Sequence, residues 1–248
     1  MTITAPEQSQ VLGPAIDPAH RRAARIAGVL FVLTFITAIA ARILFDPVRN
    51  DLDYIVGAGA DTRVFLGASM ELLLIVANIG TAVVLFPIVR RQSEALALGY
   101  VTARLVECTF IAVGLLSLLA VVTLRQDAAG ADPDSLVLAG QSLVAVYDWT
   151  FLFGPGFVAG LGNGLILGYL MYRSGLVPRR MAMLGLVGGP MLAASGIAIL
   201  LGAFDAGSAG QGILSIPEIA WEASLGIYLV VKGFKPSSPI LVGLRSRP

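Results

Sequence analysis

Charged side chains are scarce in this chain. Of its 248 residues only 13% are charged, whereas 56% are hydrophobic, and a soluble domain usually carries about 25% charged residues. Water-soluble, nucleic-acid-binding and disordered proteins all need more charge or less apolar surface. The composition therefore excludes these three classes and any nucleic-acid partner. It indicates an integral membrane protein whose main partner is the lipid bilayer.

Residues that bind metals and cofactors are almost absent. Cys108 is the only cysteine and His20 is the only histidine. One thiol can form neither an internal disulfide nor a CxxC redox pair, and haem or zinc sites need several such ligands. The only two lysines, Lys232 and Lys235, stand at the end of the last apolar run, which argues against a retinal Schiff base. We expect no metal and no cofactor.

Long apolar runs predict the fold class. A membrane-spanning helix needs about 20 mostly apolar residues, and six runs meet this condition. The predicted spans are 22–45, 63–89, 96–124, 148–173, 179–203 and 216–233. We therefore expect an all-α fold, a polytopic membrane bundle of six transmembrane helices within residues 21–235. The polar, proline-containing residues 1–20 are predicted to be a disordered cytoplasmic tail, and residues 236–248 a second cytoplasmic tail.

The basic residues predict the orientation of the bundle, because loops rich in Lys and Arg stay on the cytoplasmic side of a membrane. With the N-terminus inside, 12 of the 17 Lys and Arg residues fall on the inner side, four fall on the outer side and Arg104 lies within a span. A wrong number of helices would disturb this alternation. The pattern predicts that both termini are cytoplasmic.

Residues 136–173 are the least regular part of the pattern. They form 38 nearly uncharged residues, which are too many for one span at about 1.5 Å per residue. We expect one span after Asp148, preceded by a helical segment 136–147 that either lies on the outer face or extends the helix beyond it. The sequence Gly154-Pro155-Gly156 is expected to kink this span, because proline removes one backbone hydrogen bond.

Glycines at a spacing of four residues mark a packing face. The fourth span contains Gly156, Gly160, Gly164 and Gly168, and the fifth span offers Gly185 and Gly189 as partners. Small residues let membrane helices approach closely. The ladder predicts close packing of the fourth and fifth spans within one chain, or alternatively a seam between two copies in a homo-oligomer.

Several polar residues lie deep in the predicted spans, where ionisable groups are costly and mark candidate sites. Arg104 and Glu107 are three residues apart, so they share a helix face. Three deep carboxylates, Glu71, Glu107 and Glu222, stand against the single deep guanidinium of Arg104, which is a formal excess of two negative charges. The expected buried polar network, or ligand or proton site, comprises Glu71, Asn78, Arg104, Glu107, Glu222 and Tyr228.

A second set of polar residues is expected at the outer ends of the spans. Asp148 and Trp149 begin the fourth predicted span, and Glu218 follows Pro217 near the start of the sixth. An acidic residue in the first turn of a helix favours the positive end of the helix dipole, so Glu218 is interpreted as a cap. Trp149 and Trp221 are expected in an aromatic belt at the membrane surface.

Three functions of the deep residues remain open. The first is a structural network that fixes the packing of the helices. The second is a proton or cation relay, or a pocket for a cationic solute, in which Glu71, Glu107 and Glu222 bind while Arg104 keeps one of them ionised. Catalysis is the least favoured, because no serine has a histidine partner and no phosphate-binding loop is present. We expect that the protein is not an enzyme.

Several motifs together resemble a known family. They are the basic residues that open the first span, Glu71, Arg104-x-x-Glu107, the run DWTFLFGPG at 148–156, the run GYLMYRSGLVPR at 168–179, Glu222, and Lys232-Gly233-Phe234. From about residue 21 to 235 the chain resembles the bacterial membrane family called domain of unknown function 4386. The resemblance implies a six-span protein of the bacterial inner membrane, and it implies no activity, cofactor or catalytic residue.

The sequence thus predicts an integral inner-membrane protein whose core is organised by a Glu/Arg network. One alternative is a proton-coupled transporter or channel for a small solute that uses the buried carboxylates. The other is an assembly or signalling partner that uses the glycine face or the segment 136–147.

Overall fold

The computed structural model describes residues 17–51, 53–57 and 61–242, and within these ranges it contains helices and no strand. Six helices are long and apolar enough to cross a membrane within this part of the chain. The elements are α1 (Pro18–Leu44), α2 (Asp46–Asn50), α3 (Asp61–Val89), α4 (Glu94–Gln126), α5 (Pro133–Phe151), η1 (Leu152–Val158), η2 (Gly160–Leu167), α6 (Gly168–Ser174), α7 (Arg179–Leu200), α8 (Ala209–Val231) and α9 (Pro239–Val242). The all-α membrane bundle predicted from the sequence is confirmed.

Polar capping residues fix where several helices begin. Asp17, Ser93, Asp132 and Ser208 accept hydrogen bonds from backbone N–H groups in the first turns of α1, α4, α5 and α8. These bonds satisfy donors that a helix start otherwise leaves free. At Asp132 the side chain and the backbone N–H of Ser135 both donate, and these bonds hold the pKa of this exposed carboxyl below its ordinary value.

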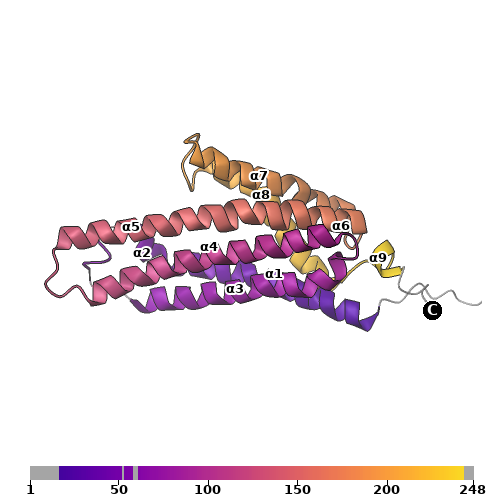
Figure 1. Cartoon of the computed structure of the whole chain (residues 1–248), viewed down its shortest axis with the longest axis horizontal. Helices are drawn as coiled ribbons and strands as arrows, with labels where there is room; N and C mark the ends of the chain where they lie inside the picture. Colours follow the sequence, from indigo (N-terminus) through magenta and orange to yellow (C-terminus); the bar gives the residue numbers. More distant parts are fainter. Residues whose placement is uncertain (1–16, 52, 58–60, 243–248) are drawn as a thin grey trace, which may run out of the picture.

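The spans run nearly side by side (Figure 1), and the contacts between them form a closed ring. Along the chain, α1 packs on α3, α3 on α4, and α4 on α5 and its π-helical continuation. This continuation then packs on α7, α7 packs on α8, and α8 returns to α1. We call the end where α1 begins and α8 ends the N/C end, and the opposite end the distal end. The ring gives each helix one face toward a shared interior.

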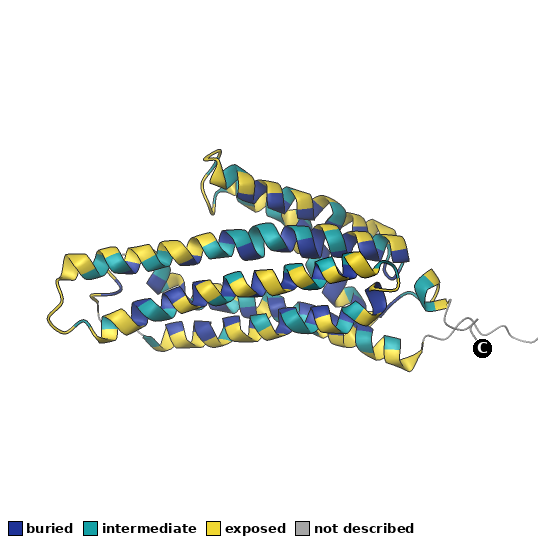
Figure 2. Ribbon diagram, in the orientation of Figure 1, coloured by how far each residue is buried: buried dark blue, intermediate teal, exposed yellow. Residues whose placement is uncertain are grey.

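The fourth span is longer than predicted. α5, η1, η2 and α6 form one helical rod over Pro133–Ser174, 42 residues in all. At 1.5 Å per residue it is about 60 Å long, twice the hydrocarbon thickness of about 30 Å. Segment 136–147 is therefore a helix extension, the second of the two alternatives left open by its sequence. Its distal end projects beyond α7 and α8 and is largely exposed (Figures 1 and 2).

The glycine- and proline-rich centre of this rod is π-helical. At the end of η1 the N–H of Ala159 bonds to the carbonyl of Gly154, five residues earlier. Pro155 cannot donate a backbone hydrogen bond, and a wider turn accommodates this loss within a rod that runs on without interruption in Figure 1. At the place of the expected kink the rod contains two π-helical segments, η1 and η2.

Two apolar layers hold the ring together. The layer at the distal end contains buried residues of α1 to α5, with Phe45, Leu118 and Tyr147 among them. The layer at the N/C end includes Phe31 of α1, Leu170 of α6, and Trp221 and Leu225 of α8. Buried residues of α7 and α8 occur only in the second layer, among those assigned to either layer. α8 has no buried residue before Glu218, so its distal half is less tightly joined to the bundle, whereas α7 buries residues up to Gly196.

The predicted tails overlap in part with ordered structure. Residues 1–16 and 243–248 lie outside the described residues, whereas Pro18 to His20 already form the first turn of α1. After α8 the chain stays at the N/C end, where the N–H of Lys235 donates to the carbonyl of Leu176 at 2.8 Å. Ser238 donates to the carbonyl of Ser174 at 2.7 Å. The segment that follows the last span is thus packed against the turn between α6 and α7.

Candidate functional site

A buried ion pair lies at the centre of the ring. Arg104 of α4 is only 2% exposed, and its Nη1 donates to Glu107 Oε2 at 2.7 Å. Its Nη2 donates to Asn78 Oδ1 of α3 at 2.9 Å, while Asn78 Nδ2 donates to Glu107 Oε1 at 3.2 Å. The three side chains form a closed hydrogen-bonded triangle between two helices. A buried charge needs such compensation, because moving an ion from water into the protein interior costs on the order of several kcal/mol.

Three further residues complete the surroundings of Arg104, and no sequence pattern pointed to them. Thr81, one turn after Asn78 on α3, lies 3.5 Å from Arg104 Nη2. Tyr100 donates to Thr81 at 3.3 Å. The guanidinium carbon of Arg104 lies 5.9 Å from the centroid of the Phe31 ring, which is a cation–π contact. Threonine, tyrosine and phenylalanine are common in membrane helices, so only the packing identifies them.

Glu222 of α8 is held by the π-helical segment of the neighbouring rod. The side-chain amide of Asn163 in η2 donates to Glu222 Oε1. The indole N–H of Trp221 donates to the backbone carbonyl of Asn163 at 3.0 Å. Trp221 is fully buried, so its predicted place in a surface aromatic belt is wrong. Because its indole faces Gly185 of α7, where no side chain intervenes, it packs inside the bundle.

Glu218 is the most unusual residue of the site, and its predicted role as a helix cap is wrong. The cap of α8 is Ser208, because residues 209–216 belong to the helix and not to the preceding loop. Glu218 therefore lies more than two turns inside α8 and is 2% exposed. Neither of its carboxyl oxygens has a hydrogen-bond partner among the described residues.

Glu71 does not join the cluster around Arg104. It lies two turns before Asn78 on α3, about 10 Å along the axis, and its Oε1 accepts a hydrogen bond from Tyr147 of α5 at 2.7 Å. Within the described part of the chain its Oε2 has no partner. Glu71 and Asn78 are seven residues apart and so share a helix face, but the rise of the helix places them at different depths in the bundle.

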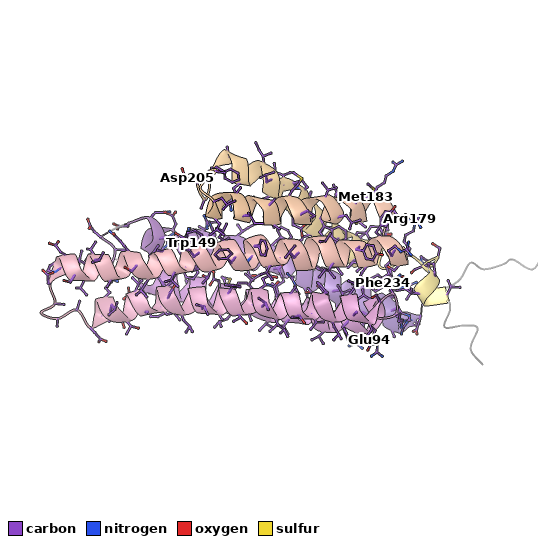
Figure 3. All side chains as sticks on the ribbon, turned by 45° about the horizontal axis from the view of Figure 1, so that its top comes forward. Glu94, Trp149, Arg179, Met183, Asp205 and Phe234 are labelled. Atoms are coloured by element: carbon purple, nitrogen blue, oxygen red, sulfur yellow. The ribbon has the colours of Figure 1, made fainter. Side chains whose placement is uncertain are left out.

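The other predicted site residues lie near the surface or in apolar contacts. Asp148, within the long rod, pairs with Arg49 of α2 at 2.6 Å. Trp149 is 46% exposed and stacks on Phe153, and Figure 3 shows it on the outer side of the rod. Tyr228 packs against the apolar layer at the N/C end. None of these three takes part in the hydrogen bonds described above for Arg104 and Glu222.

The glycine ladder joins two helices of the same chain. A Cβ at Gly160 would lie 2.6 Å from the carbonyl oxygen of Gly189, and one at Gly168 would lie 3.2 Å from the carbonyl carbon of Gly185. Gly164 meets Gly189 in the same way and also borders the carboxyl group of Glu218. Because α7 covers this face, the ladder packs two helices within one chain, as the first of the two alternatives expected. Gly156 lies apart from this contact and faces the interior.

A half-enclosed cavity of about 380 Å³ connects these polar groups. The polar residues that line it are Thr34, Asn78, Arg104, Glu107, Gln211, Ser215, Glu218 and Glu222. The lining extends from Gln211, in the first turn of α8 at the distal end, to Glu222 in the middle of that helix. Ile39 of α1 and Ile219 of α8 also line it, and both are more than half exposed. The mouth of the cavity therefore lies beside these two residues, between α1 and α8.

Comparison with known proteins agrees with this architecture. No curated protein and no solved structure matches the chain. The sequence model of one family, described as "Domain of unknown function (DUF4386)", matches residues 26–233. This range begins within α1, ends just after α8 and contains every residue of the central cluster and cavity. The chain, a multi-pass membrane protein with six candidate spans in its described part, thus belongs to the DUF4386 family.

Proposed function

We propose that this protein transports a small solute across the membrane, and that the central cavity is its translocation site. The observation that carries the proposal is the half-enclosed cavity that reaches Arg104, Glu107, Glu218 and Glu222 from the distal end. Its volume of about 380 Å³ falls in the range of roughly 300–1,000 Å³ that is typical of small-molecule sites.

The cost of the buried charges supports a site over a purely structural network. Each ionisable group in a span costs about 2.5–3.5 kcal/mol on insertion scales, and such groups usually line pathways or cavities. A structural network would satisfy its own members. Arg104, Glu107 and Asn78 bond to one another, and only the Nε of Arg104 lacks a partner among them in the described part of the chain. Glu218 has no such partner within the described residues, although it borders the cavity.

The position of the site supports transport over catalysis. The cavity lies between the two apolar layers, in the middle of the ring, where a carrier holds its solute between the two sides of the membrane. The carboxyl groups of Glu107, Glu218 and Glu222 come from two helices, and in this proposal they also exchange protons that couple solute movement to a proton gradient. We place the protein in the bacterial cytoplasmic membrane, with both termini in the cytoplasm.

The experiment asks whether one position in the cavity is reached from both sides of the membrane. In a Cys108→Ser background, which removes the only native thiol, Ala159→Cys places a single thiol on the cavity wall. Membrane-impermeant thiosulfonate reagents, one cationic and one anionic, are added to right-side-out and to inverted membrane vesicles. The matched control is Ala27→Cys, which lies in the apolar layer at the N/C end.

Transport requires that Ala159→Cys reacts in both kinds of vesicle, because a carrier exposes its site to each side in turn, while Ala27→Cys remains unreactive. Reaction from one side only would overturn the transport proposal and leave a binding site. Reaction from neither side would show a dry interior and would overturn both.

A further inference from the structure

The charges around the cavity do not balance. Among the residues that the structure describes, Arg104 is the only basic one that lines it, and it is bound to Glu107 and Asn78. Glu222 accepts a hydrogen bond from the side-chain amide of Asn163, which is a neutral group. Glu218 receives no hydrogen bond from any described residue. The wall thus carries three carboxyl groups and one guanidinium, and this guanidinium is already paired.

The carboxyl group of Glu218 is placed to meet a ligand. It is 98% buried, it lines the cavity, and both of its oxygens are unpartnered in the part of the chain that the structure describes. Gly164 of η2 lies against it, and a Cβ at that position would collide with Glu218 Oε2. The absence of a side chain at Gly164 therefore leaves room for the carboxyl group of Glu218. An unpaired buried carboxylate is costly, and a cation in the cavity would offset that cost.

The rest of the wall is apolar and partly aromatic. Phe35, Leu74, Ile111, Phe151 and Leu192 line the cavity beside the acidic groups. Aromatic rings attract organic cations through their electron-rich faces, and aliphatic walls favour an apolar ligand body. The exposed Ile39 and Ile219 at the mouth belong to the lipid-facing surface of the bundle. A ligand with an apolar part can thus approach from the bilayer.

The chemistry of the site disfavours an inorganic ion. No group of three or more metal-ligating side chains is found within the described ranges. Hard cations such as Mg²⁺ and Ca²⁺ need about six oxygen ligands, whereas most of this wall is hydrocarbon. A proton alone would not require a cavity of about 380 Å³.

We propose that the cavity binds an amphipathic organic cation, an ammonium group attached to an apolar body, with Glu218 as its counter-charge and Glu222 as a second acidic contact. The inference rests on the proposed function, because it takes the cavity as the ligand site, and it names the class of solute.

The test is equilibrium binding by calorimetry to the full chain in detergent. The probe is benzyltrimethylammonium, whose charge is independent of pH, and its matched comparisons are the neutral benzyl alcohol and the anionic phenylacetate. We expect only the cation to bind, and we expect Glu218→Gln, which keeps the shape of the side chain, to weaken its binding at least tenfold. Ala159→Leu, which fills part of the cavity, should weaken it as well.

Two control variants separate this effect from general loss of charge or stability. Glu71→Gln changes a buried carboxyl group that does not line the cavity, and Glu94→Gln changes an exposed one at the start of α4. Both should bind benzyltrimethylammonium as the unmodified chain does.

The outcomes distinguish this inference from transport itself. Equal binding of benzyl alcohol, preferred binding of phenylacetate, or cation binding that is insensitive to Glu218→Gln would overturn the assignment to cations. Absence of binding by all three probes would do the same, even if Ala159→Cys is labelled from both sides. Cation binding combined with one-sided labelling would retain the ligand class and overturn transport.

Discussion

Arg104 is the one cation of the buried cluster, and this makes it harder to replace than any single carboxylate near it. Its guanidinium bonds to Glu107 and Asn78, and the carboxyl groups of Glu218 and Glu222 line the same cavity. Removal of a partner from a buried ion pair leaves an uncompensated charge. At the scale of single residues, the stability of the centre therefore depends unequally on its members.

Arg104→Ala should lower the free energy of unfolding by about 3–5 kcal/mol. Glu107→Gln should cost less, about 1–3 kcal/mol, because the amide oxygen of glutamine still accepts from Arg104. Thermal unfolding of both purified variants in detergent checks this order, with the exposed Arg22→Ala as the control for loss of a positive charge. Equal melting temperatures of the two central variants would contradict it.

Tyr147 supplies the one hydrogen bond of Glu71 among the described residues. Tyr147→Phe should destabilise the protein by about 1–3 kcal/mol, because both oxygens of a buried carboxyl group would then lack a donor. Adding Glu71→Leu to this variant should recover part of the loss, since the polar group is removed together with its partner. A double-mutant cycle of unfolding free energies measures the coupling, and strictly additive effects would rule it out.

At the scale of elements, α7 is the helix that most depends on glycine. Its Gly189 meets the rod at Gly160 and Gly164, its Gly185 meets the indole of Trp221, and its Gly188 meets the backbone of α8 at Glu218. Lipid provides no hydrophobic drive for helix pairing, so close backbone contact is what joins these elements. α7 thus sets the distance between the rod and α8, and with it the position of Glu218.

Gly189→Ala should separate α7 from the rod and lower the melting temperature markedly, because the new methyl group would meet backbone atoms that cannot move aside. Gly212→Ala is the matched control, since it also lies in a helix but its Cβ would have no neighbour within 4 Å. There, alanine should be neutral or stabilising by up to about 1 kcal/mol. Thermal unfolding in detergent compares the two, and a similar change for both would refute this account.

At the scale of the whole molecule, the two apolar layers divide the bundle into unequally packed halves. The N/C end joins α1, α3, α4, α6, α7 and α8, whereas the buried members of the distal layer come from the first five helices and the loops between them. Local opening is easiest where few buried contacts oppose it. The cavity mouth lies in the looser half, where movement of α7 and α8 changes access.

Hydrogen exchange followed by mass spectrometry should therefore show two rates within one helix. In α8 the turns Ala209–Ile216 should exchange faster than Leu225–Leu229, which is anchored in the N/C layer. α4, which contributes to both layers, serves as the internal comparison and should be protected along its central turns. Uniform protection along α8 would contradict a division into two halves.

The sequence was sufficient for the number of spans, because 20-residue apolar runs and basic loops are local signals. It also placed Arg104 and Glu107 on one face, since their spacing alone determines this. It failed for Glu218, because residues 209–216, which mix apolar side chains with two glycines, a glutamine and a serine, could belong to a loop or to a helix. It could not connect Glu222 with Asn163 or Glu71 with Tyr147, since these pairs lie 59 and 76 residues apart and depend on which helices become neighbours.

The unequal lengths of the helices have a consequence for the surrounding lipid. One flank of the protein presents a rod of about 60 Å, while α7 and α8, with 22 and 23 residues, measure only about 35 Å. A bilayer responds to such mismatch by local thinning, by thickening or by tilting of the protein, each at a modest energetic cost per ångström. The conformational free energy of the protein therefore depends on the acyl-chain length of the lipids. Thinner or thicker membranes would change the tilt of α7 and α8 relative to the rod.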